Sequence, residues 1–344
     1  AKPKTTQNLP GEKNYTYYVP KGVFAVISVW NFPLAISVGM TSAALVTGNT
    51  VVFKPSEYTP VIGYRLAKIY QEAGIPKGVF NLLYGHGDVG SALIENENIL
   101  GVAFTGSKDT LLNIRLRSAQ NNCHYGIKDV CVGESGGKGK IIIDEDANLD
   151  EAVRIVRNSF LGYAGQKCSA GTTAIVIGSR QRYDKFLKRL SEATDSVNMG
   201  PPEDPNTFLP PLISEKQLSK VRGYVQIGKK EARLVYEGKV PKDLKSQGYY
   251  HPPVIFADVP IKSRIAQEEI FGPVLCVMQA KDLNEAIELF NNSQYALTGG
   301  IVSSLPSHIE RAKLECNVGN FYINREITGA VVSVSYTHLT LPTN

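Results

Sequence analysis

The 344-residue sequence contains few of the residues that build disulfide frameworks or metal centres. It has five cysteines, an odd number, and no two of them show the Cys-x-x-Cys spacing of a zinc ligand pair. Its five histidines form no cluster with several cysteines. A disulfide framework, a structural zinc site and a catalytic metal are therefore not expected. Reduced cysteines indicate a cytoplasmic protein.

Long apolar runs and a one-sided charge are also absent. No segment is apolar and charge-free over the length that a bilayer span needs, and the first residues lack the apolar core of a secretory signal. The formal net charge of +5 is spread along the chain. We therefore expect neither a membrane nor a nucleic acid as a partner. The length allows two domains with a sizeable core.

The first third of the chain alternates segments typical of buried strands with amphipathic helical segments. This rhythm predicts an α/β protein with a doubly wound parallel sheet, and similar α/β units continue from residue 139 to about residue 330. A Pro-rich stretch at 199–212 predicts a long surface loop. The predicted elements of the first third are strands at 22–30, 49–56, 78–85 and 101–107 and helices at 33–48 and 60–76.

One cysteine, Cys168, is distinguished by its surroundings. It lies in YAGQKCSAGT (163–172), among small residues that would let a substrate approach the sulfur. A cysteine without a disulfide is usually a buried small apolar residue, which is the simpler interpretation. A helix that begins at or just after Cys168 would favour the thiolate and make the sulfur a nucleophile. The residues alone leave both interpretations open.

Polar residues follow the first two predicted strands. Asn31, in WNFP, lies where open α/β sheets bind ligands, and its amide is suited to stabilise an oxyanion. A turn before Phe-Pro explains it equally simply. In FKPSE (53–57), Lys54 and Glu57 would donate to and accept from ribose hydroxyls, although a solvated charge pair at a strand end fits as well.

Three further stretches combine glycine with polar residues. In AFTGSKDT (103–110), Gly106 would permit close backbone approach, and the following helix would offer N–H groups to a phosphate. In GESGGK (133–138), Glu134 is either a general base or an ordinary loop carboxylate. QEEIFGP (267–273) alone predicts only a helix end.

The order of these stretches is more specific than any one of them. WNFP, FKPSE, FTGS, ESGGK, GQKCSA and EEIFGP follow one another with the spacing of the aldehyde dehydrogenase superfamily, which this chain resembles from about residue 17 to about residue 332. The resemblance implies an NAD-binding, Rossmann-like domain and an α/β catalytic domain that meet at the active site. We place these domains at residues 1–133 and 134–332.

The resemblance also implies a role for each motif. Cys168 would attack the aldehyde carbon as a thiolate, and the Asn31 amide with the Cys168 backbone N–H would stabilise the oxyanion. Glu134 would activate the water that cleaves the thioester. Glu57 would disfavour a 2′-phosphate, so the expected cofactor is NAD. The implied cofactor-binding residues are Ser28, Trp30, Lys54, Glu57, Thr105, Gly106, Ser107, Thr110, Glu269 and Phe271.

Within the superfamily, the sequences of three stretches resemble those of the 1-pyrroline-5-carboxylate dehydrogenase group, which oxidises L-glutamate γ-semialdehyde to L-glutamate in proline breakdown. Ser169 in GQKCSA and the backbone N–H groups of Gly329 and Ala330 in NREITGA would bind the substrate carboxylate, and Phe32 would flank the aliphatic stem. The third stretch that resembles this group is RIAQEEIFGPVL (264–275). Another semialdehyde dehydrogenase, an inactive NAD-binding fragment and a piece of a bifunctional proline-oxidising protein remain alternatives.

Three residues depart from the family pattern. Leu111 replaces a usual glycine, and a bulky residue there would disturb helix–strand packing beside the pyrophosphate. Gly133 replaces an apolar residue before the base, and Gly139 replaces Asn or Asp. We expect each glycine to loosen a loop that carries Glu134.

Family members are usually longer, so the chain is expected to be a fragment that lacks an N-terminal helical region. Residues 333–344 are interpreted as a non-native tail that stands in place of a Gly-rich stretch and an oligomerisation strand. The full-length protein would form a homo-oligomer and act on a small aldehyde, and the fragment would lack the strand that joins its subunits.

Overall fold

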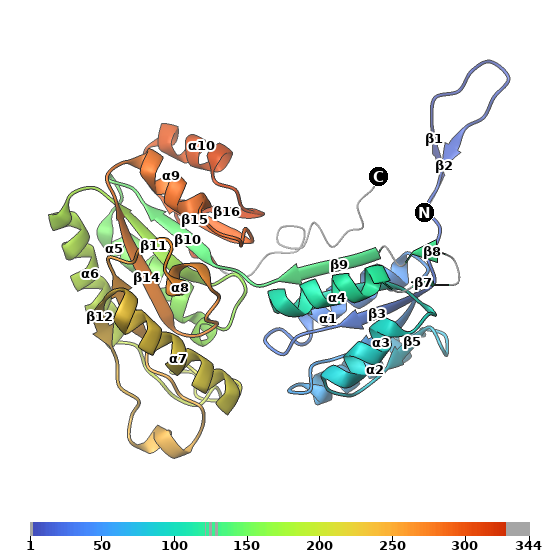
Figure 1. Ribbon diagram of the computed structural model, residues 1–344, viewed down its shortest axis with the longest axis horizontal. Helices are drawn as coiled ribbons and strands as arrows, with labels where there is room; N and C mark the ends of the chain where they lie inside the picture. Colours follow the sequence, from blue (N-terminus) through green and yellow to red (C-terminus); the bar gives the residue numbers. More distant parts are fainter. Residues whose placement is uncertain (1–2, 121, 124–125, 128–129, 328–344) are drawn as a thin grey trace. The chain divides into compact units, whose positions relative to one another are not determined.

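The computed structural model describes residues 3–120, 122–123, 126–127 and 130–327 (Figure 1). The chain divides into two units, and among the described residues the division falls between Ser135 and Gly136. The sequence prediction set its domain boundary two residues earlier. The functions of the two domains stay a prediction.

The first unit is built on a parallel five-stranded sheet with the order β5-β4-β3-β6-β9. The chain passes from β3 outward to β4 and β5, then returns to place β6 and β9 on the other side of β3. The order therefore reverses between β3 and β6, which is the switch point where such sheets bind ligands. The strands are β3 (Val23–Ile27), β4 (Thr50–Lys54), β5 (Phe80–Leu82), β6 (Ile99–Gly106) and β9 (Val130–Ser135).

Two helices cover each face of this sheet, because successive strand residues point to opposite faces. Phe24 and Val26 pack into one apolar cluster with α1 and α2, whereas Ala25 packs into another with α3 and α4. The doubly wound arrangement predicted from the sequence is confirmed. The helices are α1 (Ala35–Val46), α2 (Pro60–Glu72), α3 (Gly87–Glu95) and α4 (Lys108–Gln120).

Two short antiparallel strand pairs complete the described part of this unit. They were not predicted from the sequence, and both consist of strands of two residues. They are β1 (Lys4–Thr5) with β2 (Tyr15–Thr16), and β7 (Asn122–Cys123) with β8 (Gly126–Ile127).

The second unit has a seven-stranded sheet with the order β12-β13-β14-β11-β10-β15-β16, parallel except for the edge strand β12. Its interior strands are almost fully buried and mostly apolar, as expected for a sheet that is covered on both faces. The strands are β10 (Gly139–Ile143), β11 (Gly171–Ile177), β12 (Arg233–Glu237), β13 (Val254–Ala257), β14 (Val274–Ala280), β15 (Thr298–Val302) and β16 (Asn320–Ile323).

Helices again cover both faces of the second sheet. One apolar cluster joins α5, α6 and α7 to the strands, and another joins α9 and α10. Helix α5 has acidic residues in its first turn, and Asn148 caps it by accepting from the N–H groups of Asp150 and Glu151. The helices are α5 (Leu149–Leu161), α6 (Arg180–Asp195), α7 (Glu215–Glu231), α8 (Arg264–Gln267), α9 (Leu283–Asn291) and α10 (Pro306–Glu315), with 3₁₀ turns η1 (Gly162–Gly165) and η2 (Asp243–Ser246).

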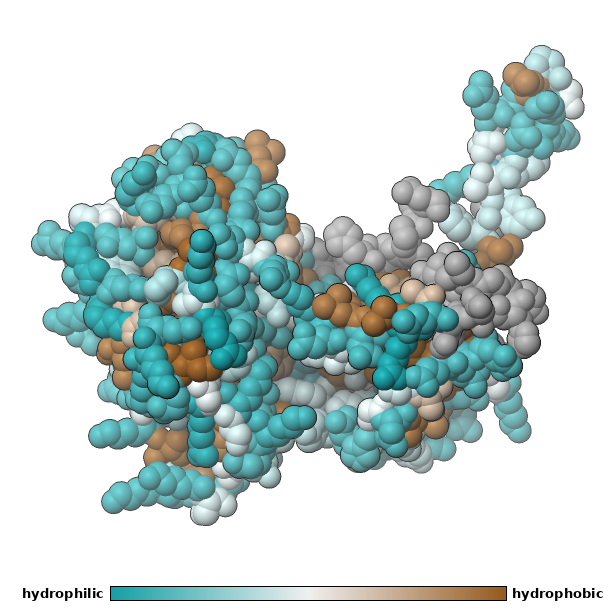
Figure 2. Space-filling model, in the orientation of Figure 1, coloured by the Kyte–Doolittle hydropathy of each residue, from teal (hydrophilic) through white to brown (hydrophobic). Residues whose placement is uncertain are grey.

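The face of the molecule shown in Figure 2 is mostly hydrophilic, with scattered apolar patches. The Pro-rich stretch at 199–212 is irregular and largely exposed between α6 and α7, as predicted, with Leu209 and Leu212 as its buried anchors. Among the described residues, no helix has the length and apolar character required to cross a membrane.

Candidate active site

The sequence-predicted residues of the first unit gather at the carboxyl edge of its sheet. Ile27 pairs with both Lys54 and Phe104 across the sheet, and Thr105 pairs with Glu134. The ends of β3, β4, β6 and β9 therefore lie next to one another around the switch point between β3 and β6.

The turn after β3 is held by hydrogen bonds at Ser28. Its backbone N–H donates to the Lys54 carbonyl at 3.1 Å, and its hydroxyl accepts from Ser37 Oγ at 2.8 Å. Asn31 is only 5% exposed in this turn, and Trp30 and Phe32 beside it are half-buried. The predicted amide donor is thus carried on a short, well-packed connection to α1.

Lys54 ends β4 with a buried side chain. Its Nζ lies 3.4 Å from the Pro55 carbonyl. Burial lowers the pKa of Lys54, and the carboxylates of Glu57 and Asp88 oppose this shift. Glu57 itself is exposed. A buried amine beside an exposed carboxylate is suited to bind a pair of hydroxyl groups.

The turn from β6 into α4 is compact. A Cβ at Gly106 would lie 2.3 Å from the Phe104 ring, so no side chain fits there. Ser107 Oγ lies 2.7 Å from Thr110 Oγ1 and accepts from the Thr110 N–H, which caps α4. Thr105 Oγ1 instead lies 3.5 Å from Met40 Sδ, inside the core. Any contact of Thr105 with a cofactor would therefore come from its backbone.

Glu134 lies on β9, so the interpretation of Glu134 as a loop carboxylate is wrong. Its side chain is half-buried, and burial raises the pKa of Glu134 to about 7, against the effect of a hydrogen bond from the Ser135 backbone. A carboxyl group with this pKa is substantially ionised at neutral pH and still basic enough to take a proton from water.

Leu111 does not disturb the packing of α4, contrary to expectation. It is 5% exposed and occupies the space beside Gly133. A Cβ built at Gly133 would lie 2.1 Å from Leu111 Cδ1. Leu111 therefore fills the space that Gly133 leaves open, and Gly133 belongs to a strand rather than to a loosened loop.

In the second unit, Cys168 lies in a turn between η1 and β11, with the Ala170 N–H donating to the Lys167 carbonyl at 3.1 Å. A strand follows this turn, so the prediction that a helix dipole acts on the sulfur is wrong. Cys168 is 9% exposed. Its position is set instead by the backbone that surrounds the turn.

The backbone before Cys168 is strained. Tyr163, Ala164 and Gly165 have φ values of 61°, 54° and 68°, in the left-handed region that residues with a side chain rarely adopt. A Cβ at Gly165 would lie 2.3 Å from the Gly272 carbonyl oxygen. Strain of this kind persists where the surroundings enforce it, which is common at functional sites.

Three motifs that are far apart in the sequence meet around this turn. A Cβ at Gly137 would lie 1.8 Å from the Cys168 carbonyl oxygen, so the glycine pair of ESGGK packs directly on the backbone of GQKC. The Gly137 N–H donates to Glu269 Oε1 at 2.7 Å. Gly136, at φ 59°, leaves room for the same carboxylate, because a Cβ there would lie 2.7 Å from Glu269 Oε2.

The two adjacent glutamates of EEIFGP have different environments. Glu268 forms hydrogen bonds with Arg264 and with the Tyr224 hydroxyl. Burial raises the pKa of Glu269, opposed first by the Gly137 N–H and then by Lys220 and Lys138. Glu269 is therefore the member of the pair that turns toward the Cys168 region. The glutamates follow α8, as the predicted helix end requires.

Phe271, the other predicted cofactor residue of this motif, has a φ of 61°. Its carbonyl oxygen accepts from Gln217 Nε2 at 2.7 Å, which ties the motif to α7. The left-handed backbone at Phe271 is a conformation that residues with a side chain rarely adopt.

Lys138, the last residue of GESGGK, was not predicted from the sequence to have a functional role. Its side chain is 3% exposed, and within the described residues Nζ has no hydrogen-bond partner. Burial lowers the pKa of Lys138, and this effect is opposed first by Cys276 and then by Glu269. The signal that would have revealed it is a lysine directly after two glycines that lead into an apolar strand.

Ser169, next to Cys168, has a buried hydroxyl without a hydrogen-bond partner among the described residues. Gly139 begins β10, and a Cβ there would lie 2.6 Å from the Ala170 carbonyl oxygen. The expectation that Gly139 loosens a loop is therefore wrong, since tight packing requires a glycine. The other predicted carboxylate ligands, Gly329 and Ala330, lie outside the described residues.

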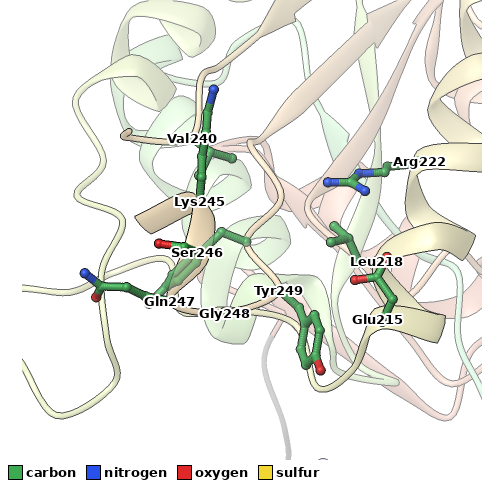
Figure 3. Close-up of a pocket in the computed structure, with 10 residues that line it drawn as sticks. Glu215, Leu218, Arg222, Val240, Lys245, Ser246, Gln247, Gly248 and Tyr249 are labelled. Atoms are coloured by element: carbon green, nitrogen blue, oxygen red, sulfur yellow. The ribbon is translucent and has the colours of Figure 1, made fainter. Parts of the chain in front are cut away.

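These second-unit residues precede strands, so they lie at the amino edge of the sheet. Cys168 precedes β11, Lys138 precedes β10, and Glu269 precedes β14. A cavity of about 750 Å³ elsewhere in this unit lies between α7 and the segment after β12 (Figure 3). Its lining includes Glu215, Arg222 and Lys245 but none of the sequence-predicted site residues.

Comparison with known proteins identifies the fold. The profile of the aldehyde dehydrogenase family matches residues 1–337. This chain belongs to the aldehyde dehydrogenase family. The resemblance predicted from the six ordered motifs is therefore confirmed, and so is the α/β fold class.

Relatives within the family carry a more specific name. The chain is 43% identical over 330 residues to a 1-pyrroline-5-carboxylate dehydrogenase of Geobacillus sp. (strain WCH70), with 95% of this chain and 62% of that protein covered. It therefore spans a little under two thirds of the length of this relative.

Two solved structures are similar to the chain. One is a 1-pyrroline-5-carboxylate dehydrogenase from Thermus with bound NAD, at a TM-score of 0.90 and 42% identity over 96% of this chain and 63% of that one. The other is proline utilization A from Bdellovibrio bacteriovorus, at a TM-score of 0.91 and 44% identity over 96% of this chain and 34% of that one.

Proposed function

We propose that this chain performs the NAD-dependent oxidation of L-glutamate γ-semialdehyde to L-glutamate, with Cys168 as the nucleophile. The observation that carries the proposal is the packing of Gly137 against the Cys168 backbone while the Gly137 N–H binds Glu269. Three motifs from distant parts of the sequence thereby build one polar site around a cysteine. The names of the relatives support the choice of substrate.

In this mechanism the Cys168 thiolate attacks the aldehyde carbon and forms a thiohemiacetal. The Asn31 amide and the Cys168 N–H stabilise the negative oxygen. Loss of hydride from the same carbon leaves a thioester on Cys168. Glu134 then takes a proton from water, whose oxygen attacks the thioester carbon, and the thiol and L-glutamate are released.

The residues proposed to bind the cofactor have the donors and acceptors that NAD requires. Lys54 and Glu57 offer a donor and an acceptor for the adenosine ribose, and the close packing at Gly106 lets backbone at the start of α4 approach a phosphate. The Glu269 carboxylate would accept from the nicotinamide ribose, with Phe271 beside it. NAD, when bound, supplies the hydride acceptor.

Ser169 favours a substrate with a carboxylate. Its buried hydroxyl lacks a hydrogen-bond partner among the described residues, and a buried hydroxyl in that state is costly unless a ligand completes it. A carboxylate at the far end of the aldehyde chain would accept that hydrogen bond. The proposed anchor at Gly329 and Ala330 would add backbone donors to the same group.

The test is a comparison of NADH formation by the wild-type chain, Cys168→Ala and Ser169→Ala. We expect no NADH from Cys168→Ala while NAD still binds. Ser169→Ala should raise the KM for L-glutamate γ-semialdehyde more than the KM for a simple aliphatic aldehyde of similar length. Turnover by Cys168→Ala would refute the nucleophile. An equal effect of Ser169→Ala on both aldehydes would refute the carboxylate contact and favour another semialdehyde as substrate.

A further inference from the structure

We propose that Leu111 is a positioning residue for Glu134, acting through its contact with Gly133, and this inference rests on the proposed function of Glu134 as the base. The contact is unusually close. A Cβ built at Gly133 would lie 2.1, 2.9 and 3.1 Å from Leu111 Cδ1, Cδ2 and Cγ. Because all three atoms are near, rotation of the leucine tip alone does not make room for a methyl group at Gly133.

The leucine has little freedom to move away. It is 5% exposed and belongs to an apolar cluster with Phe104 and Ile114. Its neighbours are therefore close-packed, and a shift of Leu111 would displace them in turn. The less costly response to a larger residue at Gly133 is a shift of the strand that carries it.

That strand is free to shift on one side. Among the described residues, β9 ends the first sheet and pairs only with β6. An edge strand lacks the second ladder that holds an interior strand. The packing of α4 against β9 therefore has a larger share in fixing where β9 lies, and the Leu111–Gly133 contact is part of that packing.

Alternation along β9 connects this contact to the proposed base. Cys131 packs into the cluster on the α4 face, whereas Val130 packs into the cluster on the α1 face. Gly133 therefore faces α4, and Glu134, the next residue, faces the opposite side. A push on Gly133 moves the Glu134 backbone with it, and a displacement of about 1 Å at a catalytic group can cost on the order of a hundredfold in rate.

The volume at this contact is filled from the helix side. Gly133 has no side chain, and the Leu111 side chain occupies the space beside it. The support for β9 at this position therefore comes from α4.

The experiment compares Leu111→Ala, Gly133→Ala and the double variant with the wild type, with Leu112→Ala, an exposed leucine on the same helix, as the control. The first readout is the free energy of unfolding from denaturant titration. The second is the pH titration of the Glu134 carboxyl group, followed by NMR of ¹³C-labelled glutamate and assigned with Glu134→Gln. Neither readout requires turnover, so a failure of the proposed function leaves this test intact.

We expect Gly133→Ala to destabilise the protein when Leu111 is present and to do so much less when residue 111 is alanine. The Glu134 titration midpoint should fall in Gly133→Ala by about one pH unit, since a displaced edge strand admits water to the carboxyl group. It should return toward the wild-type value in the double variant. Additive effects on stability, or a Glu134 midpoint that is the same in Gly133→Ala and the wild type, would overturn the proposal.

Discussion

Gly137→Ala is the most informative single substitution, because the added methyl group meets backbone rather than a side chain. Its Cβ would lie 1.8 Å from the Cys168 carbonyl oxygen, whereas ordinary van der Waals contact begins at 3.4 Å. The two backbones would have to separate by the difference of about 1.6 Å. Overpacking of this kind typically destabilises a protein by about 1–3 kcal/mol.

The displacement would act directly on the proposed nucleophile. The Gly137 N–H also binds Glu269, so a shift of Gly137 either moves the Cys168 turn or breaks this 2.7 Å hydrogen bond. A misplacement of more than 1 Å should lower the rate of thioester formation by about a hundredfold or more. Because the substitution leaves Cys168 and Glu269 in the sequence, any loss arises from geometry.

The assay measures the rate at which iodoacetamide alkylates Cys168, located by peptide mass spectrometry, and the thermal midpoint of the same samples. Gly223→Ala is the matched control, since this glycine lies in α7 with nothing within 4 Å of a built Cβ. We expect Gly223→Ala to be as stable as the wild type or slightly more stable. A Gly137→Ala protein with wild-type stability and a wild-type alkylation rate would refute the packing argument.

Two further predictions concern pH. Lys140 is 2% exposed and donates to the Phe290 carbonyl at 2.7 Å, and burial lowers the pKa of Lys140 to about 8. Because the unfolded chain keeps this proton up to a higher pH, the free energy of unfolding of the wild type relative to Lys140→Met should increase between about pH 8 and 10.5. Denaturant titration measures this difference between the two proteins, and a difference that stays constant with pH would contradict the prediction. For Glu134 the change of stability with pH has the opposite sign, because its pKa of about 7 lies above the ordinary value of 4.5. The free energy of unfolding of the wild type should therefore fall relative to that of Glu134→Gln as pH increases from about 4.5 to 7. Thioester hydrolysis should become faster over the same pH range. A hydrolysis rate that is independent of pH across this window would count against Glu134 as the base.

Local patterns in the sequence were sufficient for the strands and helices that lead to the site. The alternation of apolar strand and amphipathic helix predicted β3, α1, β4 and α2, and the glycines that follow both helices have positive φ values, as helix ends require. Lys54 was expected just past a strand, whereas in the structure it is the last residue of β4.

The remaining features depend on contacts between residues that are distant in the sequence. Nothing near Cys168 reveals that Gly137 packs on its carbonyl oxygen, and nothing near Gly133 reveals that Leu111 fills the adjacent space. The glycine pair after Glu134 indicated a loop, but pairing with β6 extends the strand to Ser135. A sequence pattern reports the local preference of the backbone, whereas the conformation at these residues is determined by the distant residues that contact them.

The central claim is that Cys168 carries the acyl group, and a trapped intermediate tests it most directly. The measurement is peptide mass spectrometry of Glu134→Gln after incubation with L-glutamate γ-semialdehyde and NAD. We predict an added glutamyl mass on the peptide that contains Cys168. Oxidation of the aldehyde with the added mass on a different cysteine, or with no protein-bound acyl group, would contradict the account.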